Sequence, residues 1–124
     1  MNGNAHTALI ACYHQKRKEQ YTKAALEEGW DVHTVSQGAD AFDLLHKRRY
    51  DLIVMDESID DQSPVEFSLN AADIATNHPA IVVAAKRFTP VKALWDKCRV
   101  IHAAPFEDTA AKLPHLLERV AASS

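Results

Sequence analysis

The stretch Tyr50–Asp51–Leu52–Ile53–Val54–Met55–Asp56 decides the fold that this sequence predicts. Its four consecutive apolar residues stand between acidic residues, a pattern typical of a strand that is buried on both faces. Such strands belong to parallel sheets that carry helices on both sides. Asp56 would then stand at the carboxyl end of the strand, where open α/β sheets bind ligands. Asp56 is therefore the first candidate functional residue.

Length, composition and charge exclude several classes of protein. The chain has 124 residues, enough for one domain, and its 47% hydrophobic and 25% charged residues are ordinary for a globular protein. A net charge of −3 argues against nucleic-acid binding, and the basic cluster at residues 16–18 is more simply the solvated start of a helix. No apolar run approaches the roughly 18 residues that cross a membrane. Two separated cysteines, Cys12 and Cys98, indicate reduced thiols and a cytoplasmic setting.

Apolar patterning predicts strands that alternate with helices along the whole chain. We expect strands at 7–12, 30–36, 51–56, 80–85 and 99–104, and helices at 14–28, 38–49, 63–76, 89–97 and 107–120. Gly29 would end the first helix, and Ser63 with Glu66 forms a capping box for the third. Pro114 falls inside the last helix, which therefore either kinks there or begins near Leu113. This alternation predicts one doubly wound α/β domain over residues 1–124, with a parallel sheet and right-handed crossovers.

Four segments carry a resemblance to a known family: Gly29–Trp30–Asp31–Val32, Gly38–Ala39–Asp40–Ala41, the stretch 50–56, and Pro105–Phe106. Together, and in this order, they resemble the receiver domain of bacterial two-component response regulators, and the resemblance covers essentially the whole chain. It implies a flavodoxin-like (βα)5 domain with strand order 2-1-3-4-5. It also implies that the residue at the end of the third strand, here Asp56, is the position that accepts a phosphoryl group from a histidine kinase.

The resemblance also implies site positions that this chain fills with other residues. In the family, an acidic pair after the first strand helps to bind Mg²⁺, a Thr or Ser ends the fourth strand, a Lys follows the fifth, and an aromatic residue precedes that Lys. These positions hold Cys12 and Tyr13, Ala84, Ala104 and Ile101. A thiol and a phenol are poor ligands for Mg²⁺, and losing one charge-stabilising donor typically costs about 2.7–4 kcal/mol of transition-state stabilisation. We therefore predict a degenerate receiver, or pseudo-receiver, whose phosphoryl chemistry is disabled or strongly altered.

Three other interpretations of this edge of the sheet stay open. In the first, Asp60 or Asp61 replaces the missing carboxylates, so that Asp56 is still phosphorylated with Mg²⁺ in an atypical site. A small molecule could instead occupy the space left by the missing acidic side chains. In the third, Cys12, His14 and Asp56 lie close together and form a soft-metal site, or Cys12 is a redox sensor. We favour simpler roles, with His14 at the start of a helix and Cys12 as a small buried side chain that fills the core.

The function favoured by these residues is protein–protein interaction in signalling, without phosphate and without any cofactor. The resemblance implies a contact face made by segments 89–97, 99–104 and 107–120, whose candidate contact residues are Phe88, Lys92, Trp95 and Arg99. For Trp95, a position in the core is the alternative, because the helical phase around it is not settled by the sequence. Its occupant would be a kinase, an output domain, another signalling protein or a second copy of the chain. No nucleophile elbow or Gly-rich phosphate loop is present, which predicts that the chain is not an enzyme. His102 is expected in the core or at the surface, and the chain is either a stand-alone receiver or the first part of a longer protein.

Overall fold

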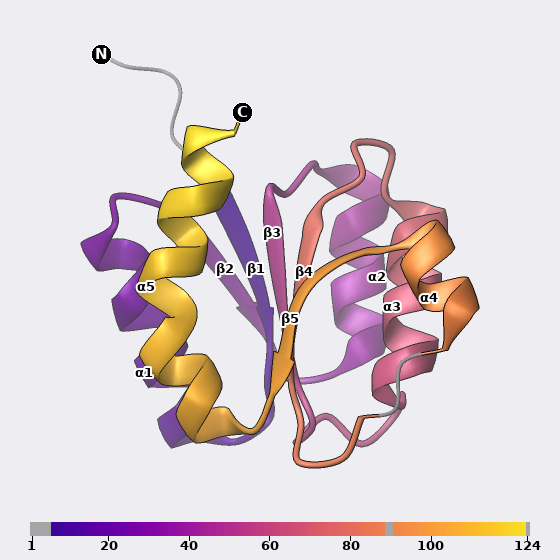
Figure 1. Ribbon diagram of the computed structural model, residues 1–124, viewed down its shortest axis with the longest axis horizontal. Coiled ribbons are helices and arrows are strands. Elements are labelled where there is room, and N and C mark those ends of the chain that lie inside the picture. The colour runs from indigo at the N-terminus through magenta and orange to yellow at the C-terminus, as the bar shows by residue number, and fades with distance from the viewer. Residues whose placement is uncertain (1–5, 89–90, 124) are drawn as a thin grey trace.

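The parallel sheet has five strands in the order β2-β1-β3-β4-β5, as predicted (Figure 1). The computed structural model describes residues 6–88 and 91–123, without the side chains of Ala93 and Trp95. Its strands are β1 (Thr7–Ala11), β2 (Asp31–Val35), β3 (Leu52–Asp56), β4 (Ala80–Ala84) and β5 (Arg99–Ala104). The doubly wound α/β fold predicted from the sequence is thus confirmed, with β3 at the centre and β2 and β5 at the two edges.

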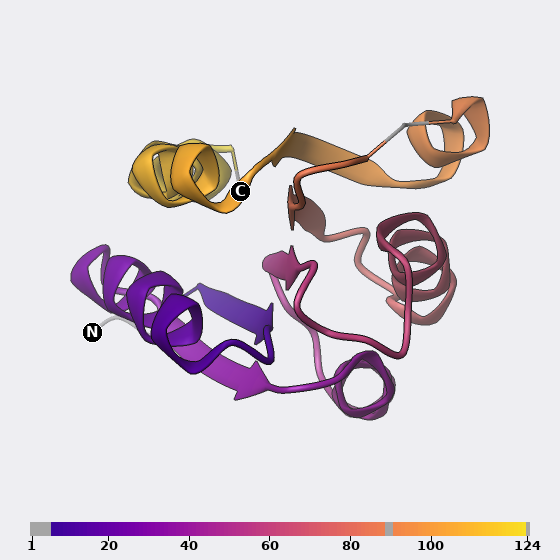
Figure 2. The same ribbon diagram turned by 90° about the horizontal axis from the view of Figure 1, so that it is seen from below.

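Helices cover both faces of the sheet (Figure 2). One layer holds α1 (Gln15–Glu27) and α5 (Phe106–Ala122), and the other holds α2 (Gly38–Lys47), α3 (Pro64–Ile74) and α4 (Lys92–Lys97). The predicted helix at 89–97 corresponds to α4, and its proposed opening residues Thr89 and Pro90 lie outside the described residues. Within the described ranges, no helix has the length and apolar composition needed to cross a membrane.

The central strand explains why the sheet needs helices on both sides. Leu52 and Val54 pack into a core beneath α1 and α5, whereas Ile53 and Met55 pack into a second core beneath α2, α3 and α4. Side chains alternate between the faces of a strand, so an uninterrupted apolar run fills both cores. Burying each such side chain is worth about 1.5–3 kcal/mol. The same alternation turns the next residue, Asp56, toward the layer of α1 and α5.

Local capping signals set the helix starts close to the residues predicted from the sequence. His14 is the residue before α1, and its Nδ1 accepts a hydrogen bond from the backbone N–H of Arg17 at 3.3 Å. The predicted capping box of α3 is confirmed, because Ser63 and Glu66 each bond to the other's backbone N–H. Three of the predicted helices extend further at their carboxyl ends than the observed ones, which end at Glu27, Lys47 and Ile74. Helix ends fray, so such differences of one or two residues are ordinary.

Pro114 lies within α5, which begins at Phe106, so a start near Leu113 is wrong. A proline inside a helix costs about 3 kcal/mol, because it removes a backbone donor and crowds the preceding turn. The apolar side chains of α5 on both sides of Pro114 outweigh that cost, since each contributes about 1.5–3 kcal/mol when buried. They are Leu113, Leu116, Leu117 and Val120, all buried, while Pro114 itself is exposed.

Gly29 follows α1 in a left-handed conformation with φ of +83°, which only glycine adopts without strain. A Cβ built at this position meets no atom within 4 Å, so substitution would cost backbone strain and not steric overlap. We expect Gly29→Ala to lower the free energy of unfolding by about 1–2 kcal/mol, and Gly29→Asn by less. Urea unfolding followed by circular dichroism measures both values. Wild-type stability in Gly29→Ala would contradict this account of how α1 ends.

Candidate functional site

Asp56 ends β3 with a side chain that has no exposed surface. Its Oδ1 accepts a hydrogen bond from the backbone N–H of Ser58 at 2.8 Å, and its Oδ2 accepts one from the Tyr21 hydroxyl at 2.5 Å. A guanidinium nitrogen of Arg17 lies 3.5 Å from Oδ1. Both carboxylate oxygens are therefore engaged by donors from the protein itself.

Tyr21 delivers its hydroxyl from the buried face of α1. Its side chain has no exposed surface, and its ring meets the ring of Phe106 edge-on, with 5.7 Å between the centroids. Burial first, and then the hydrogen bond to Asp56, raises the pKa of Tyr21 far above its ordinary value. The phenol therefore stays protonated and acts as a permanent donor to the carboxylate.

Arg17 covers the carboxylate from outside, one helical turn before Tyr21. Its guanidinium carbon lies 4.9 Å from the centre of the Phe106 ring, and its side chain is only 22% exposed. The prediction of a solvated basic cluster at residues 16–18 is thus wrong for Arg17, although Lys16 is exposed. A buried carboxylate is costly unless a positive charge pairs with it. Arg17 supplies that charge, and Phe106 holds its guanidinium plane in place.

Ser58 joins the loop after β3 to the loop after β1. Its Oγ accepts hydrogen bonds from the backbone N–H groups of Tyr13 at 2.8 Å and His14 at 3.0 Å. The same oxygen lies 3.5 Å from the sulfur of Cys12. Together with the bond from its own N–H to Asp56, these contacts fix two loops around the end of β3.

Cys12 and His14 do lie near Asp56, since Ser58 contacts both, but the Cys12 thiol is poorly suited to bind a metal. Cys12 is fully buried, and its thiol donates to the carbonyl of His14 at 3.3 Å. Burial raises the pKa of the Cys12 thiol, the hydrogen bond with Ser58 lowers it, and the charge of Asp56 raises it again, with a net increase. A raised pKa disfavours the thiolate, which is the form that binds metals and reacts with oxidants.

Asp61 has a structural role that the sequence did not indicate. Its two carboxylate oxygens accept hydrogen bonds from the backbone N–H groups of Gly38 at 2.8 Å and Ala39 at 2.9 Å, which are the first groups of α2. Burial acts to raise the pKa of Asp61, but these hydrogen bonds outweigh it and the pKa is lowered. The neighbouring Asp60 is exposed. Asp61 thus caps a helix from a distant loop, and both of its oxygens are occupied.

The remaining positions implied by the resemblance contribute backbone and apolar surface. Ala84 is buried and its carbonyl accepts from the N–H of Glu57, while the carbonyl of Ala104 accepts from the N–H of Ala85. Ile101 is partly buried against the core beneath α1 and α5. Tyr13 is 66% exposed and lines an open depression of about 580 Å³ together with His14, Gln15, Lys16, Ser36 and Ser58.

The candidate contact face lies at the opposite edge from β2. Arg99 is exposed on β5, and Lys92 is exposed on α4 with its ammonium 3.5 Å from Asp96. Phe88 is partly buried against the core beneath α2, α3 and α4, so only part of its ring remains available for a partner. The side chain of Trp95 lies outside the described residues.

His102 ties β5 to α5 and is not part of the site at Asp56. The hydroxyl of Thr109 donates to the carbonyl of Ala104 at 3.0 Å, so its oxygen accepts from the Nε2–H of His102 at 3.0 Å. Burial and then the charge of Lys112 lower the pKa of His102, against an opposing effect of Asp108. His102 is therefore neutral near pH 7, as expected for a residue at the core boundary.

The residues around Asp56 do not fit a bound Mg²⁺. The two positions after β1 offer a buried thiol and an exposed phenol, and the guanidinium of Arg17 stands beside the carboxylate of Asp56. Across residues 6–88 and 91–123, no three His, Cys, Asp or Glu side chains lie close enough to share a metal ion.

Arg17, Tyr21 and Ser58 are the site residues that sequence reasoning missed. One signal in the sequence could have indicated Arg17 and Tyr21. They are four residues apart and so share a helix face, and their helix follows β1, the strand next to β3. Ser58 gave no such signal, because its contacts depend on how two loops meet in space.

Comparison with known proteins gives the fold of this chain. No family model matches the sequence, and no curated protein matches it. A CheY-like receiver domain from Methylobacillus flagellatus superimposes with a TM-score of 0.77 at 18% identity, covering 94% of this chain and 99% of the other. The N-terminal domain of a response regulator/sensory box/GGDEF 3-domain protein from Carboxydothermus hydrogenoformans superimposes with a TM-score of 0.74 at 17% identity, with 94% of each chain covered.

A third solved structure of the same fold carries a metal ion. The receiver domain of a sensor histidine kinase from Pseudomonas aeruginosa has a magnesium ion coordinated in its active-site cleft. It superimposes with a TM-score of 0.73 at 15% identity, covering 95% of this chain and 98% of the other. The chain thus has the fold of response-regulator receiver domains.

The hydrogen bond from Tyr21 to Asp56 predicts a large loss of stability in Tyr21→Phe. Removing the hydroxyl leaves a buried carboxylate oxygen without a donor, which costs about 1–3 kcal/mol. Urea unfolding at pH 7 measures this cost. Tyr13→Phe is the matched control: its ring is exposed, so we expect a change within about 0.5 kcal/mol. Equal stabilities of the two variants would contradict the role assigned to Tyr21.

The lowered pKa of Asp61 predicts a specific pH dependence of stability. The folded protein binds fewer protons at this group than the unfolded chain, so stability from Asp61 is present above its ordinary pKa and is lost as pH falls through the folded value. Asp61→Asn keeps a capping side chain but removes the charge. We expect the stability difference between wild type and Asp61→Asn to shrink as pH falls from about 6 to about 3. Unfolding titrations at each pH measure it, and a constant difference would contradict the prediction.

Proposed function

We propose that this chain is a signalling module with a receiver fold that acts by binding a protein partner, without phosphorylation of Asp56 and without catalysis of its own. The observation that carries the proposal is the complete burial of Asp56 beneath Tyr21 and Arg17. Receiver domains with the same fold supply the signalling context. The degenerate site supplies the expectation that phosphate is dispensable.

The burial of the Asp56 carboxylate is the first argument against its phosphorylation. Phosphoryl transfer requires the attacking oxygen to stand in line with the leaving group, and positioning with charge neutralisation provides most of its catalysis. Oδ2 of Asp56 is held by the Tyr21 hydroxyl, and Oδ1 is held by Ser58 and faced by Arg17. A phosphodonor would have to displace both α1 side chains from a core that also includes Phe106.

The charged groups around Asp56 are a second argument against its phosphorylation. A phospho-acceptor site needs cations that neutralise the transferred group, and these must be free to meet it. Arg17 is already committed to the Asp56 carboxylate, and the alternative acidic ligand Asp61 is committed to α2. The atypical magnesium site that the sequence left open is therefore the weaker proposal, and we assign Asp56 and Arg17 to a fixed internal ion pair.

The partner would dock at the outer edge of β5, between β5 and the carboxyl-terminal part of α5. Arg99 and Arg119 line a depression of about 350 Å³ there, with Ile101 and Val120 among its other lining residues. Both arginines are exposed, and no acidic residue lines the depression. Arginine with apolar surface is a common composition of binding hot spots. The chemistry suits a protein segment with an acidic and an apolar side chain.

Beryllofluoride with Mg²⁺ tests independence from phosphate. We expect no change in the amide spectrum of α4, β5 and α5, and no incorporation of label from acetyl phosphate, because both oxygens of Asp56 are engaged and the guanidinium of Arg17 stands beside the carboxylate. NMR spectra and radiolabelling measure the two responses. Stoichiometric, magnesium-dependent labelling that Asp56→Asn abolishes would overturn the proposal.

Charge reversal on β5 tests the partner face. Affinity capture from the source organism, followed by titration of the captured protein, measures binding. We expect Asp56→Asn to bind like the wild type and Arg99→Glu to bind at least about tenfold more weakly, since like charges across an interface cost several kcal/mol. Arg49→Glu is the matched control, because Arg49 is an exposed arginine after α2. Loss of binding in Asp56→Asn, or equal binding by Arg99→Glu, would contradict the proposal.

A further inference from the structure

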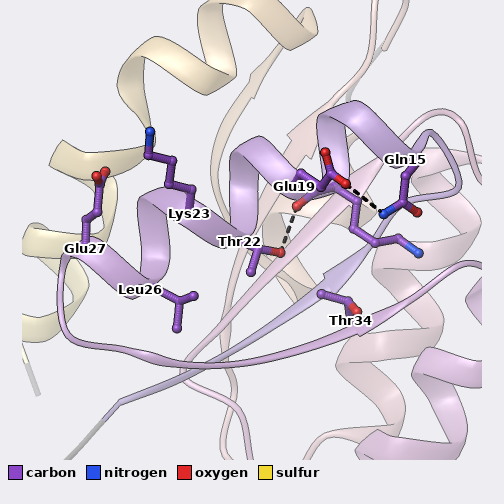
Figure 3. A pocket seen from close by; sticks show the side chains of 8 residues that line it. Gln15, Glu19, Thr22, Lys23, Leu26, Glu27 and Thr34 are labelled. Carbon is purple, nitrogen blue, oxygen red and sulfur yellow. Dashed lines mark hydrogen bonds between the residues drawn. The ribbon is translucent and has the colours of Figure 1, made fainter.

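An open groove lies between α1 and the edge strand β2 (Figure 3). β2 is the edge of the sheet opposite β5. Its volume is about 580 Å³, and Gln15, Lys18, Glu19, Thr22, Lys23, Leu26, Glu27 and Thr34 line it. Leu26 is 57% exposed, and within the described part of the chain Tyr13 and Val91 are the other large apolar side chains with such exposure. The groove therefore exposes an aliphatic side chain among charged ones, away from both Asp56 and the β5 edge.

The charges of this groove are balanced and arranged along α1. Lys23 and Glu27 are one turn apart and point to the same side of the helix, whereas Leu26 and Thr22 point to the side of Thr34 (Figure 3). In the described residues, the ion pairs are those of Arg17 with Asp56 and Lys92 with Asp96, so Lys23 and Glu27 form none. Two lysines and two glutamates line the groove, which gives it no net charge.

The strand beside the groove has a free edge. Among the described strands, β2 pairs only with β1. The N–H of Asp31 and the carbonyl of Val35 are directed to the β1 side, so the alternating residues Val32 and Thr34 present their backbone groups at the outer edge. An edge strand with unpaired backbone groups is a site at which another chain associates readily.

We propose that the α1–β2 groove binds a second copy of this chain, in a two-fold symmetric dimer with the two α1 helices antiparallel. A symmetric dimer requires a surface that complements itself. With the two-fold axis at the height of residue 25 of α1, Lys23 of each copy lies opposite Glu27 of the other, which forms two reciprocal ion pairs. The two Leu26 side chains are then offset by about 3 Å along the helix axis, at 1.5 Å per residue, and pack against each other.

Charge complementarity favours a second copy over other occupants. A basic or an acidic segment of another protein would pair with only half of the charges that line the groove. A second copy pairs Lys23 with Glu27 twice and covers both Leu26 side chains. The dimer surface also lies at the β2 edge, whereas the proposed partner face lies at the β5 edge, so the two are used independently (Figure 1).

Charge reversal and its rescue in trans test this dimer. Sedimentation velocity and equilibrium of the full chain, from micromolar to millimolar concentration, measure the dissociation constant. We expect the wild type to dimerise weakly, and Lys23→Glu and Glu27→Lys alone each to weaken the dimer by at least about tenfold, because each places like charges opposite one another. An equimolar mixture of the two single variants restores both ion pairs, so we expect a heterodimer of about wild-type affinity.

Matched controls separate this interface from a general effect of charge. Asp43 and Lys47 are exposed and four residues apart on α2, on the other face of the sheet, and Asp43→Lys and Lys47→Glu should leave the dimer unchanged. Leu26→Ala should weaken it without changing any charge. A wild type that stays monomeric over the whole range, single variants that dimerise normally, or a mixture that fails to recover would each overturn the proposal. Arg99→Glu leaves the dimer unchanged, so failure here does not affect the proposed partner face.

Discussion

A buried carboxylate at the centre of a parallel sheet needs both hydrogen-bond donors and a positive charge. Asp56 obtains the donors from Tyr21 and from the backbone of Ser58, and the charge from Arg17. These three groups come from α1 and from the loop after β3, so the burial of one carboxylate fixes how that helix and that loop meet. Phe106 extends the constraint to α5, because its ring contacts both Tyr21 and Arg17. The layer of α1 and α5 is thus held to the sheet by polar as well as apolar contacts.

Protein groups engage both oxygens of the carboxylate at the end of β3. In the receiver domain of Pseudomonas aeruginosa, a magnesium ion occupies the active-site cleft. Here Ser58 joins the loop after β1 to the loop after β3, and Arg17 provides the positive charge beside Asp56. These contacts are all internal to the chain, whereas a phosphoryl group and its metal ion can arrive and leave. This difference is the physical basis for proposing a constitutive interaction module.

The two edges of the sheet carry different chemistry. At the β5 edge, Arg99 and Arg119 give a positive depression with apolar surface beside it. At the β2 edge, the groove along α1 is neutral, with Lys23 and Glu27 on one side and Leu26 on the other. A positive surface suits a different, acidic partner, and a balanced one suits a copy of itself. The central carboxylate lies between these edges and is exposed at neither.

The sequence by itself determined the fold, because the apolar run of β3, the alternation of helices and strands, and the capping box at Ser63 are local patterns with few structural solutions. It also placed Asp56 at the end of β3. What only the tertiary structure decided is how that carboxylate is satisfied: Arg17 and Tyr21 belong to a helix that is distant in sequence, and their spacing alone does not say which way they point. The capping of α2 by Asp61 could not be predicted for the same reason. Which backbone groups a side chain meets in another segment depends on tertiary packing, and the local sequence pattern does not encode that packing.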